Sequence, residues 1–239
     1  MRPDAVRRVL DLELTAARAR RGAAPHVLDV GAGSGVLAVS LAETGCVVTV
    51  VEPSPNALAT LHRRAAEAGV AERITAVQAD SDALADLVAP GSADLVLAHG
   101  LLEVVDDPAA TVAALAGAAV AGGAVSALVA NRFATVLSRA VAGRVDEATA
   151  LLAAPTGVLG APAEALLRRF DTGSLTALLT GAGLVVAALR GQGVVTDLAS
   201  RSVREANPHS LADLEDALAE LPPLRDIATS LHALARKPG

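Results

Sequence analysis

Three glycines at alternate positions follow a short apolar run near the start of the chain. The run covers residues 27–30, and Gly31, Gly33 and Gly35 come next. Glycine suits such a turn because it adopts backbone angles that other residues resist and lets a ligand approach the main chain closely. A helix that begins after the turn presents free backbone N–H groups to an anionic part of a ligand. The spacing therefore predicts a strand, a turn and a helix that bind a nucleotide-like molecule.

Three carboxylates lie at the ends of successive apolar runs. Asp29 lies beside the glycine turn, Glu52 ends the run at 47–52, and Asp80 ends the run at 74–80. A single acid at the end of a strand is most often a solvated surface residue. Because parallel strands end at the same edge of a sheet, however, these three acids are expected to converge on one crevice. There Glu52 can accept both hydroxyl protons of an adenosine ribose, with Asp80 near the adenine ring.

The same acids distinguish between classes of cofactor. A carboxylate beside the glycine turn repels a pyrophosphate and attracts a sulfonium or an ammonium group. The dinucleotide-binding fingerprint also wants its third glycine at position 36, where this chain has Val36. These features disfavour a nicotinamide-dependent oxidoreductase, which stays an alternative, as does a non-catalytic relative that binds the cofactor.

The elements that would position these residues alternate along the chain after residue 25. Short apolar runs are followed by Ala- and Leu-rich amphipathic stretches, which is typical of βαβ units around a parallel sheet. The expected strands cover residues 26–30, 47–52, 74–80, 93–99 and 124–131. The expected helices lie near residues 35–44, 54–68, 82–88 and 108–119.

The regular alternation stops after the fifth expected strand. Residues 132–171 carry short helical patterns interrupted by Pro and Gly, and this segment is longer than an ordinary connection, so we expect a helical insert on the substrate side. The remaining pattern predicts a helix at 172–182, a strand at 184–191, a helix near 210–220 and an edge strand at 229–237.

Composition limits the domain count and the partners of the protein. A chain of 239 residues with 52% apolar content fits one domain, residues 1–239, with an N-terminal helix within residues 1–24. The net charge of −6 and an aromatic content of 1% disfavour strong general nucleic-acid binding and base stacking. The scattered histidines show no ligand spacing, so we expect no metal.

Two further features bear on location. The uncharged stretch 112–130 consists mainly of Ala, Gly and Val, and we expect the pair Gly122-Gly123 to divide it into a helix and a strand rather than leave a membrane span. The N-terminal helix carries acids and lacks the apolar centre of a signal peptide, which favours a cytoplasmic protein. Cys46 is the sole cysteine, so no intrachain disulfide can form, and its apolar surroundings predict a buried thiol.

Together these residues resemble a known family. The segments 28–35, Glu52-Pro53-Ser54 and Ala79-Asp80 look like the cofactor motifs of class I S-adenosylmethionine-dependent methyltransferases, with coverage from about residue 25 to the C-terminus. The resemblance implies an α/β fold with a doubly wound, mostly parallel, seven-stranded sheet, an antiparallel C-terminal strand and a helical insert after strand five. It also implies S-adenosyl-L-methionine as the cofactor.

The resemblance further assigns roles to individual residues. It implies that the three glycines line the methionine moiety, that Asp29 holds its ammonium group through the loop, that Glu52 holds the ribose and that Asp80 holds the adenine amine. The full expected cofactor-binding set is Asp29, Gly31, Ala32, Gly33, Gly35, Glu52, Pro53, Asp80, Ser81 and His99.

A narrower resemblance concerns the methyl acceptor. The segment 99–108 is similar to the region after the fourth strand in the bacterial tRNA carboxymethoxyuridine methyltransferase group. That group carries a basic run in its insert, which is largely missing here. The expected acceptor is therefore either a small molecule, such as a carboxylate, or a modified tRNA nucleoside.

Residues near the ends of later strands are the candidates for contacting this acceptor. Asn131 and Arg132 follow the fifth expected strand, and Arg201 follows the sixth. His99 ends the fourth and is the candidate base, although a packing role is equally open. Transfer of a methyl group from a sulfonium is an in-line displacement that mainly needs alignment and exclusion of water.

Overall fold

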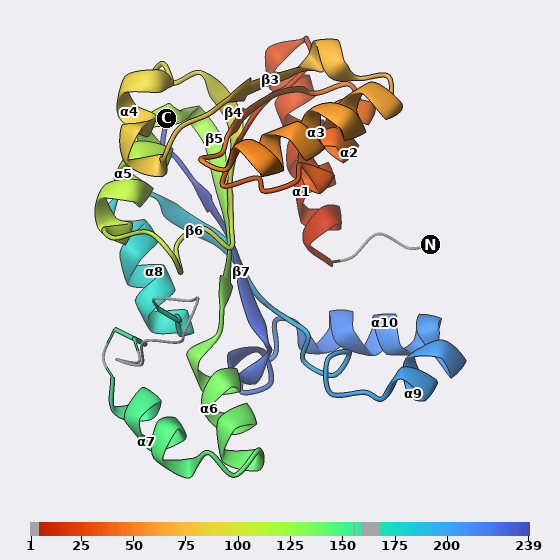
Figure 1. Cartoon of the computed structure of the whole chain (residues 1–239), viewed down its shortest axis with the longest axis vertical. Helices are drawn as coiled ribbons and strands as arrows, with labels where there is room; N and C mark the ends of the chain where they lie inside the picture. Colours follow the sequence, from red (N-terminus) through yellow and green to blue (C-terminus); the bar gives the residue numbers. More distant parts are fainter. Residues whose placement is uncertain (1–4, 155, 159–167) are drawn as a thin grey trace.

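A computed structural model gives the fold, described for residues 5–154, 156–158 and 168–239. One sheet forms its centre, with strand order β3-β2-β1-β4-β5-β7-β6 (Figure 1). Strands β1 to β5 are parallel, whereas β7 runs antiparallel to both β5 and β6. The strands are β1 (His26–Val30), β2 (Val47–Val51), β3 (Ile74–Val77), β4 (Ala93–His99), β5 (Ala119–Ala130), β6 (Val185–Gln192) and β7 (Ser230–Arg236).

Helices cover both faces of the sheet. On one face lie α1 (Ala5–Arg21), α2 (Val36–Glu43) and α3 (Pro55–Glu67), and on the other α4 (Leu84–Leu87), α5 (Pro108–Ala118) and α8 (Thr172–Gly181) (Figure 1). Beyond the end of β5 lie α6 (Arg132–Val141) and α7 (Val145–Ala153), and beside the end of β6 lie α9 (Arg201–Ala206) and α10 (Pro208–Leu218). Short 3-10 helices cover Ala71–Arg73, Ser81–Ala83 and Arg225–Ile227.

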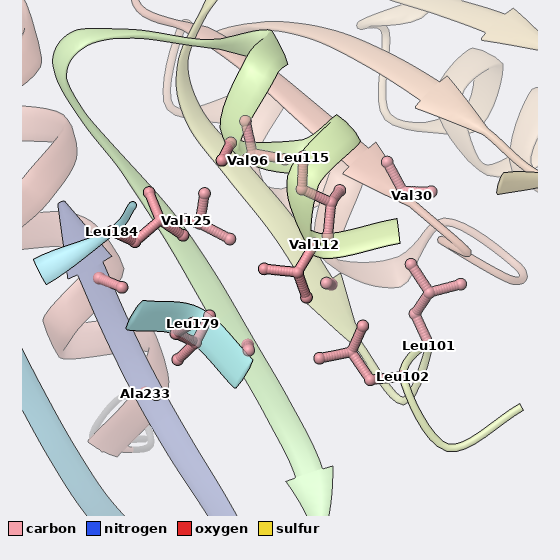
Figure 2. Packing of buried hydrophobic residues seen from close by; sticks show 14 of the residues in the cluster. Val30, Val96, Leu101, Leu102, Val112, Leu115, Val125, Leu179, Leu184 and Ala233 are labelled. Carbon is pink, nitrogen blue, oxygen red and sulfur yellow. The ribbon is translucent and has the colours of Figure 1, made fainter. Parts of the chain in front are cut away.

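Each face of the sheet has its own apolar core. The face under α5 and α8 buries Leu102, Leu115 and Leu179 completely, and Figure 2 shows these side chains gathered between the helices and strands β4, β5 and β7. The opposite face buries Leu10 of α1 and Leu61 of α3. Successive residues of a strand point to opposite faces of the sheet, and helices cover both faces here. The central strands are therefore continuous apolar runs in the sequence.

The sequence predicted this fold class correctly, and the structure has the mostly parallel seven-stranded sheet with an antiparallel C-terminal strand. The helices expected at 35–44, 54–68 and 108–119 are present within a residue or two of those bounds. The short helix α9 was not predicted.

The predicted start of the fifth strand was wrong. Strand β5 begins at Ala119, so the pair Gly122-Gly123 lies inside it rather than before it. Gly122 has a φ of 74°, and the pairing with β4 shifts register between Ala93 and Leu95. A Cβ on Gly123 would lie 3.0 Å from the carbonyl oxygen of Asp94. The two glycines therefore let a bulge form where the backbones approach closely.

The predicted position of the last strand was also wrong. β7 is not an edge strand, because it pairs with β5 on one side and with β6 on the other. The alternation of exposed and covered residues belongs to β6, which lies at the edge, whereas Leu231 to Ala235 of β7 are all buried. The continuous apolar run of β7 is the pattern of an interior strand.

The apolar stretch 112–130 is divided between α5 and β5. Among the described residues, no helix has both the length and the apolar character needed to cross a bilayer. Cys46 is buried, as its surroundings predicted.

Candidate functional site

The three glycines of the turn after β1 all have positive φ, and each has a different neighbour. The φ values are 72° for Gly31, 53° for Gly33 and 73° for Gly35. A Cβ on Gly31 would lie 3.1 Å from Leu101, and one on Gly35 would lie 2.0 Å from Leu61, whereas one on Gly33 would meet nothing within 4 Å. The lack of a side chain at Gly35 thus leaves room for Leu61 of α3, and Gly33 is the glycine that stays accessible to a ligand.

Glu52 joins the end of β2 to this turn. Its Oε2 accepts a hydrogen bond of 2.9 Å from the backbone N–H of Gly33, and its Oε1 accepts one of 2.9 Å from the N–H of Ser54. The side chain of Ser54 in turn accepts from the N–H of Ala57 and caps α3. Glu52 is buried, so these bonds hold a carboxylate in a fixed orientation beside the turn.

Asp29 is a buried carboxylate next to the same turn. Burial, and secondly the charge of Glu52, raises the pKa of Asp29 to about 7. Two interacting acids that have no basic partner among the described residues favour a cationic ligand, because a positive charge would stabilise the ionised form of both. The residues present thus fit the ammonium and sulfonium groups of S-adenosylmethionine.

A cavity of about 160 Å³ lies beside the turn, at the carboxyl ends of the strands. It brings together Gly31, Pro53, Asp80 and Ser81 from the expected cofactor-binding set. The hydroxyl of Ser81 donates to Asp80 over 3.2 Å. The other lining residues are Val30, Val51, Asp82, Leu101, Val104, Val105 and Asp106.

The segment after β4 therefore contributes a wall that the sequence did not assign to the site. Figure 2 shows Leu101 opposite Val30 at the end of β1. Glu103 fixes this segment, because its Oε1 accepts a hydrogen bond of 2.8 Å from the N–H of Ala130 at the end of β5. Arg168 donates to the carbonyl oxygen of Val105 over 2.5 Å from the other side. In the sequence, the apolar pattern around Leu101 and Val105 was the signal for this wall. The same pattern is equally typical of residues in a hydrophobic core.

His99 is not among the residues that line this cavity. It lines a second cavity of about 320 Å³ with residues of α1, α2 and β5. Its Nε2 lies 2.8 Å from Oγ of Ser126, which lies 2.8 Å from Nε2 of His232. Ser126 lies 27 positions after His99 and 106 positions before His232. No local sequence pattern therefore predicted that these three side chains contact one another.

The three candidates for acceptor binding follow β5 and β6 as expected, but each of them has partners within the protein. Asn131 is fully buried and caps α6, with its side-chain oxygen accepting from the N–H of Phe133. Its amide nitrogen donates to the carbonyl oxygens of Asp226 and Ala228. These bonds and its complete burial give Asn131 a structural role at the end of β5.

Arg132 and Arg201 also have partners in the protein. Arg132 donates to Asp171 over 2.5 Å and to the carbonyl oxygen of Ala154 over 2.7 Å, so it fastens the insert to the start of α8. Arg201 is 86% exposed on α9 and pairs with Glu205 one turn away. Neither arginine is among the residues that line the two cavities.

No group of three His, Cys, Asp or Glu side chains in the described part of the chain is arranged to hold a metal ion.

Comparison with known proteins agrees with this arrangement. Residues 27–123 match the family model described as a methyltransferase domain. The ubiquinone biosynthesis O-methyltransferase of Thiobacillus denitrificans is 37% identical over 121 residues, which is 51% of this chain and 51% of that protein. The corresponding protein of Ralstonia nicotianae is 38% identical over 101 residues, 42% of this chain and 41% of the relative. The chain thus matches about half the length of these curated relatives, and the tRNA group remains a prediction.

Solved structures match over nearly the whole chain at low identity. A SAM-dependent methyltransferase of Methanosarcina mazei has a TM-score of 0.63 at 15% identity, covering 90% of this chain and 93% of that one. The [4+2]-cyclase SpnF has a TM-score of 0.63 at 17% identity, with 97% and 81% coverage. The 1,6-didemethyltoxoflavin-N1-methyltransferase of Burkholderia thailandensis, with bound S-adenosylhomocysteine, has a TM-score of 0.58 at 19% identity, with 99% and 80% coverage.

These matches define the fold as that of the class I methyltransferases. The methyltransferase domain match extends from the second residue of β1 into β5 and includes the glycine turn, Glu52 and Asp80. The presence of a cyclase among the structural neighbours means that the fold by itself does not define the reaction.

Proposed function

We propose that this protein is a methyltransferase that uses S-adenosylmethionine and transfers its methyl group to an oxygen atom of a small acceptor. The observation that supports the cofactor best is the pair of buried acids beside the glycine turn, Asp29 and Glu52, with Glu52 bonded to Gly33. The likeness to relatives named as O-methyltransferases supports oxygen as the atom that is methylated.

The residues around the turn would each bind a different part of the cofactor. The cavity with Asp80 and Ser81 would take the adenosine, and Leu101 and Val105 would cover its ring. Glu52 has carboxylate oxygens beside Gly33 and Ser54 that can accept further hydrogen bonds from ribose hydroxyls. Asp29 would balance the ammonium charge behind the turn.

The bound cofactor would supply an activated methyl group on a cationic sulfur. The protein then has to hold the acceptor oxygen in line with that methyl group and keep water out. The segment after β4, fixed by Glu103 and Arg168, is a rigid wall for this purpose. A small acceptor is favoured over tRNA because the chain has a net charge of −6 and only two Phe as aromatic residues.

The proposal is tested by calorimetric titration of the protein with S-adenosylmethionine, S-adenosylhomocysteine and NADH. We expect saturable binding of the first two with one molecule per chain and none of NADH. Glu52→Ala should weaken the binding of both S-adenosyl compounds. Glu67→Ala, on the exposed face of α3, should leave both affinities unchanged. Binding of NADH alone would favour the oxidoreductase, and binding of none would reject the assignment of the site.

A further inference from the structure

The second cavity lies between the N-terminal helix and the ends of the later strands. Its lining comes from α1, from the first turns of α2 and from the ends of β4, β5 and β6. The apolar lining residues are Val6, Leu10, Val36, Leu37 and Leu128. At about 320 Å³ and with a mostly apolar lining, the cavity has the character of a small-molecule site.

The basic groups in the lining of this cavity are already engaged within the protein. Arg7 donates to the hydroxyl of Ser40 over 2.6 Å and pairs with Asp11 at 2.7 Å, while Nε2 of His99 lies 2.8 Å from Oγ of Ser126. None of the described lining residues is acidic. A charged occupant would lose its hydration in this cavity without gaining a counter-ion of its own, so the cavity favours a neutral molecule.

One polar side chain of the lining lacks a partner for its oxygen. Gln192 ends β6 and lines the cavity, and its side-chain oxygen is buried without a hydrogen-bond partner among the described residues. A buried carbonyl oxygen without a donor is unfavourable, and such groups are rare in folded proteins. This oxygen accepts hydrogen bonds and cannot donate them. The group that would satisfy it is therefore an O–H or N–H of the occupant.

The segment after β6 holds Gln192 in place. The buried carboxylate of Glu215, on α10, accepts hydrogen bonds of 2.6 to 3.0 Å from three successive backbone N–H groups, those of residues 194–196. The hydroxyl of Thr229 donates to the carbonyl oxygen of Gly193 over 3.1 Å. Hydrogen bonds to a carboxylate are stronger than those between neutral groups. The backbone at Gln192 is therefore fixed before any ligand binds.

Glycines precede and follow Gln192, and close contacts explain both of them. A Cβ on Gly191 would lie 2.6 Å from the Cβ of Ala228. Gly193 has a φ of 76°, and a Cβ there would lie 3.0 Å from Oγ1 of Thr229. The segment before β7 thus packs directly against the backbone on either side of Gln192. In residues 191–193 only Gln192 carries a side chain, and that side chain lines the cavity.

We propose that this cavity binds the methyl acceptor as a neutral, mostly apolar molecule, and that Gln192 recognises a hydroxyl group of it through the side-chain oxygen. The inference rests on the proposed function and names its substrate class. Gln192 is then a specificity-determining residue, because a site built to hydrogen-bond a hydroxyl group rejects an analogue that lacks it. A methyl ether of the same shape keeps the oxygen but has no proton to donate, so it leaves the oxygen of Gln192 unpaired.

The substrate class is tested with three small probes of similar shape: 4-ethylphenol, 4-ethylanisole and 4-ethylbenzoate. Carbon–proton NMR of protein with labelled Leu and Val methyl groups reports on the lining directly, in the presence of saturating S-adenosylhomocysteine. At neutral pH the phenol is uncharged, and we expect it to shift the signals of Leu10, Leu37 and Leu128 saturably. The anisole and the benzoate should bind at least about tenfold more weakly. Tighter binding of either one than of the phenol would overturn the proposal.

The role of Gln192 is tested by its loss in Gln192→Met, which keeps the length of the side chain and removes the amide. This variant should lose the preference for the phenol over the anisole. Gln192→Glu, which keeps an acceptor oxygen, and Leu198→Met, at an exposed position after the same strand, should both retain it. Equal weakening of the two probes in folded Gln192→Met would show a packing role only and overturn the proposal.

The affinity for S-adenosylhomocysteine is measured for the wild type and for each variant. Cofactor binding by the wild type without any effect of the phenol on the lining signals would overturn this inference alone. Absence of cofactor binding in the wild type would overturn the proposed function.

Discussion

The carboxylate of Glu52 accepts a hydrogen bond of 2.9 Å from the backbone N–H of Gly33, nineteen residues earlier in the chain. This bond links the end of β2 to the centre of the glycine turn after β1. The second oxygen of the same carboxylate is held by the N–H of Ser54 at the start of α3. One side chain thereby fixes the relative position of two loops that would both touch the cofactor.

Glu52→Ala should therefore affect both folding and binding. The N–H groups of Gly33 and Ser54 each lose a charged partner, so the free energy of unfolding should fall by about 1 to 3 kcal/mol. Affinity for S-adenosylhomocysteine should fall at least tenfold. Urea unfolding and calorimetry measure the two effects separately. Glu52→Gln keeps one carbonyl acceptor and should lie between the wild type and Glu52→Ala, and equal affinity in all three would exclude Glu52 from the site.

Asp29 should make the stability of the protein depend on pH. Its pKa is about 7 in the folded state, against an ordinary value near 4 in the unfolded chain. Between these values the folded state holds a proton that the unfolded state has released, so stability falls as the pH rises from about 4 to 7. The full loss is about 4 kcal/mol at most and is complete above pH 7.

Asp29→Asn removes this titration. We expect the variant to be more stable than the wild type at pH 8 and to have a flatter pH profile, while its affinity for S-adenosylmethionine falls because the ammonium loses its charge partner. Denaturant unfolding at a series of pH values, with calorimetry at pH 8, measures both changes. An unchanged slope with pH would mean that Asp29 ionises normally in the folded protein.

The glycines of the turn should respond differently to alanine. Gly35→Ala places a Cβ 2.0 Å from Leu61 and should destabilise the fold by about 1 to 3 kcal/mol through overpacking, in addition to the backbone strain. In Gly33→Ala the new Cβ meets no atom within 4 Å. The loss of folding stability should therefore be only the about 1 to 2 kcal/mol needed to hold an alanine in the left-handed conformation. The main effect of Gly33→Ala should be on cofactor affinity, because the new methyl group faces the ligand. Thermal unfolding distinguishes the pair, and equal melting temperatures would contradict this reading of the turn.

Asn131 and Arg201, both first considered for acceptor binding, should differ in their effect on stability. Asn131→Ala removes the cap of α6 and two bonds to the segment before β7, so the unfolding free energy should fall by about 1 to 3 kcal/mol. Arg201→Ala removes only an exposed pair with Glu205 and should change stability and cofactor affinity little. A large loss of cofactor or acceptor binding in folded Arg201→Ala would show that Arg201 belongs to the site.

The sequence was sufficient for the fold class, and it predicts a cofactor side of the site from signals that are local. The glycine turn, Glu52 and Asp80 each directly follow or end an apolar run, and parallel strands bring such ends together. The candidates for the acceptor side rest on position at a strand end alone, which does not show whether a side chain is already engaged. Asn131 occupies a favourable sequence position at the end of β5, yet its amide is used by the segment before β7, about a hundred residues later.

The order of the last two strands escaped prediction for a related reason. A run such as Leu231 to Ala235 indicates a strand buried on both faces, but which strands lie on either side of it depends on pairings across the whole domain. The bulge at Gly122-Gly123 depends on close approach to Asp94 of β4, and turn punctuation was the simpler interpretation of two adjacent glycines.

The place of β7 between β5 and β6 also has a consequence for biosynthesis. As the chain leaves the ribosome, β6 emerges before β7, the strand that lies between it and β5. Until β7 emerges, one edge of β5 stays unpaired. The sheet can close only after Ser230–Arg236 has emerged, and the ring of His232 arrives with that same strand. Until that moment the hydroxyl of Ser126 lacks one of the two ring nitrogens that it contacts in the folded protein. Completion of the sheet is therefore a late step, which follows the emergence of β1, β2 and the glycine turn between β1 and α2.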